Sequence, residues 1–177
     1  MSKKPTDIDL VNEVKNGSVS AFQTLYMRYL DPIYRYFFFQ TYDKFLSEDL
    51  AQEVFIKMWR AIKSFNEEKG SFTSWMYRIA HNLLIDHYRG KNPLSLKEGL
   101  EASYSEDWLE KIDREEKITK IKKALLVLPK DYQEIVILRF FEDMSVEEVA
   151  EVVGKSEENV RVIQHRAVRK LKEILII

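Results

Sequence analysis

The most constraining stretch of the sequence is residues 145–175, where two helical patterns flank a short turn. Ser145 and Glu148 have the spacing of a capping box, in which each side chain bonds the other residue's backbone N–H at a helix start. A short apolar stripe then ends at Gly154, a residue type that commonly ends helices. Ser156 can cap a second, longer helix. Its apolar side repeats at helical spacing and comprises Val160, Ile163, Ala167, Leu171 and Ile174.

The opposite side of this second helix is basic. At about 100° per residue, it carries Glu158, Arg161, Val162, His165, Arg169 and Lys172. A short helix, a tight turn and a second helix with a basic outer face form the helix-turn-helix layout, whose second helix enters the DNA major groove. An αα-hairpin with a solvated charged face is the alternative that this stretch alone leaves open.

Composition limits the class of protein. The chain has 177 residues, 45% of them hydrophobic and 32% charged, with 5 Gly and 4 Pro, which is typical of a mostly helical soluble protein. It has no Cys, which excludes disulfides and thiolate chemistry. The N-terminus is polar and no apolar run approaches the length of a membrane span. We therefore expect no direct membrane insertion and a cytoplasmic location.

The net charge of −1 does not exclude a nucleic-acid partner, because the charges are unevenly distributed. Residues 94–116 are acidic, whereas Lys and Arg outnumber Glu157 and Glu158 between residues 155 and 172. The acidic stretch cancels the total charge without cancelling the local field of the basic helix.

The N-terminal half predicts a series of helices. Residues 8–16 form a short one, and Ser20 is expected to cap an aromatic-rich stretch that Asp31-Pro32 kinks or divides. Ser47 is expected to cap a helix that runs to about Ile62. Its outer face is polar apart from Ile56 and Trp59, and this pair resembles a protein-docking surface anchored by the Trp. Coverage by another helix of the same domain is the alternative.

A polar loop at 64–71 leads to a third strong helix at 73–89. Its outward positions interleave basic and aromatic residues, with Trp75 and Asn82 towards the edges; they are Ser74, Tyr77, Arg78, His81, Ile85, Tyr88 and Arg89. This pattern favours single-stranded nucleic acid, since cations follow phosphates while rings stack on unpaired bases. An ordinary amphipathic helix with exposed tyrosines is the alternative.

Residues 90–113 contain Asn92-Pro93, Gly99 and many polar residues, which is typical of a linker. Helices are then predicted at 118–128, ending at Pro129, and at 131–141. The expected fold is all-α, with two small helical domains joined by a flexible linker and a helix-turn-helix in the second. The expected boundaries are 1–90, 91–115 for the linker, and 116–177.

No arrangement of residues predicts catalysis. The glycines are too scattered for a phosphate-binding loop, and His81 and His87 fall on different helix faces without a metal-binding motif. Paired acids such as Glu147 and Glu148 stand at helix starts, where the helix dipole accounts for them. We expect no catalytic residue, no metal site and no cofactor.

Several segments together carry a family resemblance. These are the acidic–Leu–Gln–Glu–Phe–Trp run at 47–59, the run at 70–89 with Trp75 and Arg78, Leu128-Pro129, Leu138-Arg139 and the pattern at 145–171. In this order and spacing, the chain resembles the bacterial sigma factors of RNA polymerase, in the extracytoplasmic-function (ECF) group of the sigma-70 family. The resemblance covers nearly the whole chain apart from the linker and the extreme N-terminus.

The resemblance implies a role for each surface. A docking face on the coiled-coil clamp of the largest subunit of core RNA polymerase would comprise Asp49, Gln52, Glu53, Ile56 and Trp59. The loop at 64–71 would capture a base flipped from the minus-10 element. The residues that would melt this element and hold its single strand are Lys69, Trp75, Tyr77, Arg78, His81, Asn82 and Arg89.

The helix from Ser156 would lie in the major groove of the minus-35 duplex. Its contact residues would be Ser156, Asn159, Arg161, Val162, His165, Arg166 and Arg169. Arg161 could bind a guanine edge and Val162 a thymine methyl, whereas Arg169 and Lys172 are placed to meet phosphates. Lys155, Val162 and the pair Glu157 and Glu158 depart from the family pattern, which affects the base contacts rather than the function.

The resemblance therefore implies a dissociable promoter-specificity subunit, whose partners are core polymerase, promoter DNA and an anti-sigma factor. A stand-alone helix-turn-helix regulator would need a dimer interface and a palindromic site, and would leave Ile56 and Trp59 without a role. A protein that only binds polymerase or a regulator is a third possibility, against which the basic helix argues.

Overall fold

The computed structural model describes residues 4–90 and 115–175, and within these ranges it contains helices and no strand. This agrees with the all-α prediction. The expected linker at 91–115 lies outside the described residues except for Glu115, where a helix begins.

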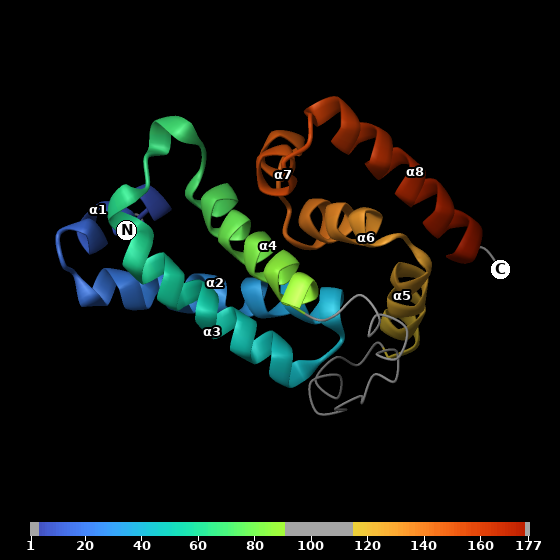
Figure 1. The fold of residues 1–177 in the computed structure, drawn as a ribbon, viewed down its shortest axis with the longest axis horizontal. Helices are drawn as coiled ribbons and strands as arrows, with labels where there is room; N and C mark the ends of the chain where they lie inside the picture. Colours follow the sequence, from blue (N-terminus) through green and yellow to red (C-terminus); the bar gives the residue numbers. More distant parts are fainter. Residues whose placement is uncertain (1–3, 91–114, 176–177) are drawn as a thin grey trace.

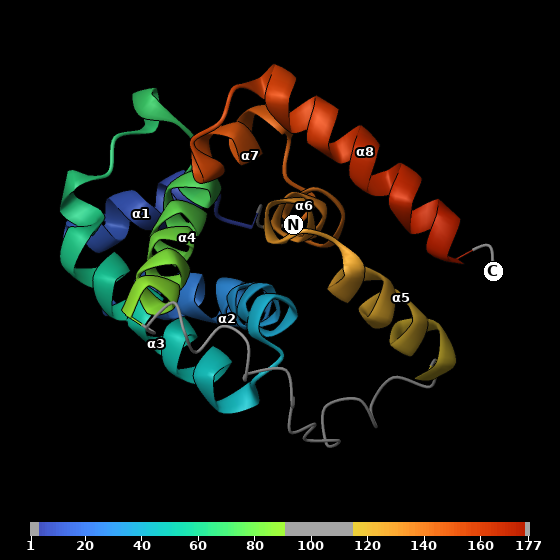
Figure 2. The same ribbon diagram turned by 45° about the vertical axis from the view of Figure 1, so that its right-hand side comes forward.

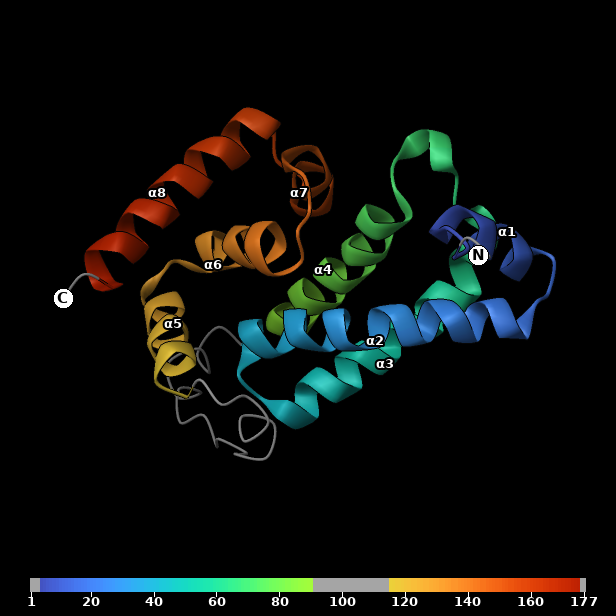
Figure 3. The same ribbon diagram turned by 180° about the vertical axis from the view of Figure 1, so that it is seen from behind.

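The N-terminal region is built from α1 (Asp7–Lys15), α2 (Val19–Thr41), α3 (Lys44–Ala61) and α4 (Phe72–Gly90). Two short 3-10 turns, Ile62–Ser64 and Glu67–Lys69, connect α3 to α4. Helix α2 packs against α1, α3 and α4, and α3 also contacts α4. Figures 1 and 3 show α2 and α3 running alongside each other, with α4 crossing them. The largest buried side chains here are aromatic, with Tyr36, Phe37, Phe72 and Tyr77 at most 2% exposed.

Two expected features of these helices were wrong. Of the kink or division expected at Asp31-Pro32, the division does not occur: α2 continues through Pro32, and buried residues on both sides of the proline, including Leu25, Ile33 and Phe37, keep the helix packed on its neighbours. Helix starts also differ: Ser18 rather than Ser20 caps α2, and Asp43 rather than Ser47 caps α3. Ser47 is instead buried inside α3, where its hydroxyl bonds the Asp43 carbonyl at 2.5 Å. Apolar periodicity locates a helix face but not its first turn.

The C-terminal region comprises α5 (Glu115–Val127), α6 (Lys130–Val136), a π-helical turn at Ile137–Phe141, α7 (Val146–Val153) and α8 (Glu157–Leu175). The predicted helix-turn-helix is α7 and α8. Ser145 and Glu148 form both bonds of the capping box, at 3.1 and 2.9 Å. Gly154 has φ +65°, a left-handed conformation that glycine adopts without strain. Val149, Val160 and Ala167 are fully buried in the core between α6, α7 and α8.

The two regions pack directly against each other. Helix α7 contacts α4, and α6 with its π-helical turn contacts α2. Figure 2 shows α7 close to the start of α4. One face of α4 is therefore an interface within the chain.

Candidate functional site

The docking face predicted on α3 is accessible. Asp49 and Gln52 are exposed, Glu53 is half-buried, and the apolar side chains of Ile56 and Trp59 are 44% and 46% exposed. The Trp59 ring rests edge-on against Phe22 of α2, with centroids 4.8 Å apart, which fixes its orientation. Another helix of the described region does not cover the pair, so α3 presents an apolar anchor inside a polar rim.

The residues predicted on α8 are also accessible. Exposed side chains belong to Ser156, Asn159, Arg161, Val162, His165, Arg166 and Arg169. The Ser156 hydroxyl accepts the Asn159 N–H at 3.2 Å and so begins the helix. The guanidinium of Arg161 donates to the Glu157 carboxylate at 2.7 Å, so one of the two acidic departures pairs directly with the expected base-contact residue.

The residues predicted on the loop and α4 to contact the minus-10 element differ in their exposure to solvent. Lys69, Arg78, Asn82 and Arg89 are exposed, and Trp75 and His81 are half-buried. The expectation that Tyr77 and Ser74 point outward was wrong, since each is 1% exposed. Tyr77 packs edge-on against Tyr36 at 5.6 Å, and the C-terminal region lies over it. The spacing of polar and apolar residues along α4 gives its polar face but does not show that the C-terminal region covers that face.

Glutamates of the C-terminal region occupy this face of α4. Glu142 accepts the Tyr77 hydroxyl at 2.7 Å and is also held by the Arg35 guanidinium through two bonds of 2.9 Å. Glu134 accepts the Tyr36 hydroxyl at 2.6 Å and lies 2.7 Å from Nδ1 of His81. Both carboxylates are thus fixed by donors from the N-terminal region.

Two further glutamates meet the start of α4. Glu148 accepts the Ser71 hydroxyl at 2.7 Å, in addition to its part in the capping box of α7. Glu151 accepts the Ser74 hydroxyl at 2.5 Å and lies 3.8 Å from the Arg78 guanidinium. Gly70 permits this approach, because a Cβ at that position would lie 2.7 Å from the Glu151 carboxylate.

The buried tyrosines are held as donors. Burial first, and then the neighbouring carboxylates, raise the pKa of Tyr36 and Tyr77 well above the ordinary value of 10.0. Burial alone would lower the pKa of Arg35, but its hydrogen bond and charge interaction with Glu142 outweigh this and raise it. These groups therefore keep the protonation states that their bonds to the glutamates require.

The glutamates Glu134, Glu142, Glu148 and Glu151 were not expected as partners of α4. Each is an acidic residue in a helix, turn or cap that is otherwise ordinary, so the sequence gives no signal that they converge. Within residues 4–90 and 115–175, no helix is both long and apolar enough to cross a membrane. The same residues hold no group of three His, Asp or Glu side chains suited to a metal ion.

Comparison with known proteins places these regions in a family. The profile of sigma-70 region 2 matches residues 25–93 and that of sigma-70 region 4 matches residues 124–173. The RNA polymerase sigma factor YlaC of Bacillus subtilis is 33% identical over 156 residues, covering 85% of this chain and 90% of that protein. The ECF sigma factor BldN of Streptomyces coelicolor is 32% identical over 176 residues, covering 95% of this chain and 65% of that protein.

The chain belongs to the ECF sigma factors of the sigma-70 family. A sigma factor with the same fold is the RpoE of Bartonella quintana, solved in complex with the anti-sigma factor NepR; it aligns with a TM-score of 0.72 at 22% identity, over 90% of this chain and 99% of that one. Helices α3 and α4 thus belong to sigma region 2, and α6, α7 and α8 to region 4. Helix α1 precedes the region 2 match.

Proposed function

We propose that this ECF sigma factor binds core RNA polymerase and directs promoter-specific initiation. Region 4 would recognise the minus-35 duplex through α8, and region 2 would melt the minus-10 element and hold its single strand through α4. The observation that carries the proposal is the presence of both regions in one chain, with the α3 and α8 surfaces exposed. Cytoplasmic action follows, because promoter DNA and core polymerase are found there.

The docking assignment is supported by the chemistry of α3. A half-exposed Trp beside a half-exposed Ile, surrounded by Asp49, Gln52 and Glu53, matches the usual composition of an interface hot spot. We assign these residues to the clamp coiled coil of the largest polymerase subunit.

The minus-35 assignment is supported by the exposed basic face of α8. Arg161 and Val162 stand near the helix start, where base edges are contacted, and Arg169 lies further along, where phosphates are met. Glu157 must release Arg161, or share it, when a guanine is bound.

The minus-10 assignment requires a change of arrangement. In this structure region 4 packs on region 2, an arrangement that we call closed. Glu134, Glu142 and Glu151 then accept hydrogen bonds from the face of α4 that would hold the DNA strand, and Tyr77 is buried. We infer that core polymerase separates region 4 from region 2 by binding each at its own site. Opening would free these donors for the promoter only within the holoenzyme.

We also expect an anti-sigma factor, since the related RpoE was solved with one. A stand-alone helix-turn-helix regulator is not favoured, because it would leave region 2 and the apolar pair on α3 without a function.

The test is co-elution of the chain with bacterial core polymerase, followed by run-off transcription from a fragmented genomic library. We expect a stable complex and new, discrete start sites. Trp59→Ala should weaken core binding by roughly thirtyfold or more, the size of a hot-spot truncation. Lys57→Ala, which is exposed on the same helix but off the docking face, is the matched control.

Binding of Trp59→Ala to core polymerase with wild-type affinity would contradict the docking assignment. Because Trp59 also contacts Phe22, thermal unfolding of the variant and the independent variant Ile56→Ala separate lost docking from lost packing. A dimer on palindromic DNA without core binding would overturn the proposed function itself.

A further inference from the structure

Helix α1 contacts the loop between α3 and α4, although it lies before the region 2 match. The connection between α3 and α4 spans residues 62–71, and its part at 64–71 is the loop predicted above to capture a base. The loop has its own short-range bonds, including Lys69 N–H to the Asn66 carbonyl at 3.1 Å. These bonds define its local shape but do not fix its place relative to α4.

Lys15, in the last turn of α1, holds the beginning of the loop. Its Nζ donates to the Phe65 carbonyl oxygen at 2.7 Å and lies 5.5 Å from the centroid of the Phe65 ring. Phe65 is only 5% exposed and contacts the rings of Phe72 and Trp75 at 5.6 and 5.4 Å. Lys15 thus fixes both the backbone and the ring through which the loop meets the first residues of α4.

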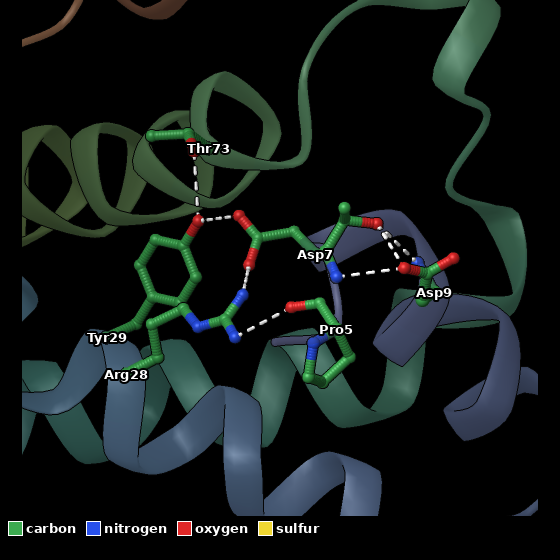
Figure 4. A network of polar contacts seen from close by, with 7 residues as sticks. Pro5, Asp7, Asp9, Arg28, Tyr29 and Thr73 are labelled. Carbon is green, nitrogen blue, oxygen red and sulfur yellow. Dashed lines mark hydrogen bonds and ion pairs between the residues drawn. The ribbon is translucent and has the colours of Figure 1, made fainter. Parts of the chain in front are cut away.

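A second connection links α1 to the first turn of α4, directly after the loop ends. The Asp7 carboxylate accepts the Tyr29 hydroxyl and the Arg28 guanidinium, and Tyr29 lies 3.0 Å from the hydroxyl of Thr73 in the first turn of α4. Figure 4 shows this chain of contacts from Pro5 and Asp7 through Tyr29 to Thr73. Burial, and then the bond to Asp7, raise the pKa of Tyr29, so its hydroxyl remains a donor.

An open cavity lies beside the second connection, with Asp7 and Thr73 in its wall. It has a volume of about 570 Å³, with Asp7 and Ile8 of α1 on one side. The loop and the start of α4 supply the rest of its wall, namely Glu67, Glu68, Gly70, Ser71, Phe72 and Thr73. The width of this cavity therefore depends on where α1 holds the loop.

We propose that Lys15 and Tyr29 are positioning residues for minus-10 recognition. Lys15 holds the beginning of the base-capturing loop, and Tyr29 holds the first turn of α4 that follows it. Together they set the distance between the loop and α4, so the base preference of region 2 depends on a helix outside the family match. The inference rests on the proposed function. Recognition of a captured base requires the loop to be placed closely, since small displacements of a binding group greatly reduce selectivity.

The experiment uses the full chain in holoenzyme and a pool of promoters randomised across the minus-10 element, with base preference obtained by sequencing the transcripts. Lys15→Met removes the donor and the charge but keeps the apolar stem. We expect it to reduce preference at the captured position by roughly threefold to tenfold, the effect of one lost hydrogen bond. Preference at the other positions, the minus-35 preference and core affinity should stay unchanged.

Three variants make the result specific. Lys4→Met removes an exposed lysine before α1 and is the matched control. Lys15→Arg should retain the wild-type preference, because Arg also donates hydrogen bonds and stacks on aromatic rings. Tyr29→Phe should reproduce the Lys15→Met effect, because it loosens the first turn of α4 against which the loop is placed.

Hydrogen exchange of the free chain gives a measurement that needs no polymerase. The amides of Phe65, Lys69 and Gly70 should exchange faster in Lys15→Met than in Lys4→Met, while those of α3 stay unchanged. A wild-type base profile, or an equal loss at every promoter position, would overturn the proposal. If the wild-type chain initiated nowhere, the proposed function would fail and the base-recognition role with it. Exchange would still decide whether Lys15 orders the loop.

Discussion

Helices α4 and α8 both carry residues predicted to contact DNA, but they differ in what covers them. The predicted residues of α8 are all exposed, and its buried side is covered by α5, α6 and α7, which precede it closely in the sequence. The polar face of α4 is covered by glutamates that lie 53 to 77 residues further along the chain. A face that the sequence predicts to bind DNA can thus be covered by a distant part of the same chain.

The difference also concerns charge. On α8, the carboxylate that pairs with Arg161 belongs to the same helix, so it stays in place whether or not DNA is bound. On α4, the carboxylates belong to region 4 and would leave with it if the two regions separated as proposed. Opening the closed arrangement would therefore change the charge beside α4 strongly and that beside α8 little.

The largest expected effect is on single-stranded DNA binding by the free chain. The triple variant Glu134→Gln/Glu142→Gln/Glu151→Gln replaces the three carboxylates that accept hydrogen bonds from α4 by neutral amides. Affinity for a single-stranded minus-10 oligonucleotide should rise by roughly a hundredfold, because three hydrogen bonds to charged groups, each contributing about 1.5–3 kcal/mol, are replaced by weaker bonds to the glutamine amides. Fluorescence anisotropy measures this rise, and affinity for minus-35 duplex should not change.

A matched triple variant controls for net charge. Glu13→Gln/Glu147→Gln/Glu173→Gln removes equal charge from exposed positions that do not contact α4. If both triple variants bound the oligonucleotide equally tightly, the glutamates at α4 would have no specific blocking role.

Arg161→Ala tests the predicted base recognition by α8. It should reduce discrimination between the preferred minus-35 duplex and a duplex changed at one base pair by about 2 kcal/mol, because a base-edge contact is lost. Lys172→Ala should instead weaken binding to both duplexes equally, since a phosphate contact carries no sequence information. Competition binding at fixed salt measures both, and an unchanged discrimination in Arg161→Ala would reject the base-contact assignment.

The contacts of Tyr36 and Tyr77 with Glu134 and Glu142 predict a response to alkaline pH. Their pKa values are raised in the folded chain, so their contribution to stability is complete below pH 10, the ordinary tyrosine value, and is lost as pH rises towards the folded values. Each hydroxyl should lower the free energy of unfolding by up to about 1.4 kcal/mol per pH unit above 10.

Urea unfolding at pH 9, 10 and 11 measures this slope. Tyr36→Phe/Tyr77→Phe has no hydroxyl to ionise at these sites and should show a shallower dependence than the wild type. Equal slopes in the two proteins would show that these tyrosines are not held as neutral donors.

Much of the fold could be predicted from local signals. The Ser145 capping box and Gly154 locate the turn of the helix-turn-helix, and the stripe of Val160, Ile163 and Ala167 gives the buried side of α8. Helix starts at Ser18 and Asp43 were missed, because several Ser and Asp residues nearby could equally serve as caps.

The contacts that control access to α4 could not be predicted. Tyr77 has the spacing of an outward residue, but it packs against Tyr36 of α2 and bonds Glu142 of the C-terminal region, and it is buried. Lys15 is likewise an ordinary cation in the last turn of α1, where the helix dipole accounts for it. Its bond to Phe65 joins residues 50 positions apart, and no local pattern marks such a pair.

The smallest expected effect concerns the pair of Glu157 and Arg161 on α8. Both side chains are largely exposed, and an exposed pair of this kind contributes only about 0.3–0.5 kcal/mol. Glu157→Gln should free the guanidinium and remove a charge that faces the phosphates, so minus-35 duplex affinity should rise about twofold. In the Arg161→Ala background the part of this gain that comes from freeing Arg161 should disappear, which a double-mutant cycle measures. An equal gain in both backgrounds would mean that Glu157 acts on the DNA phosphates alone and that Arg161 is already free to bind its base.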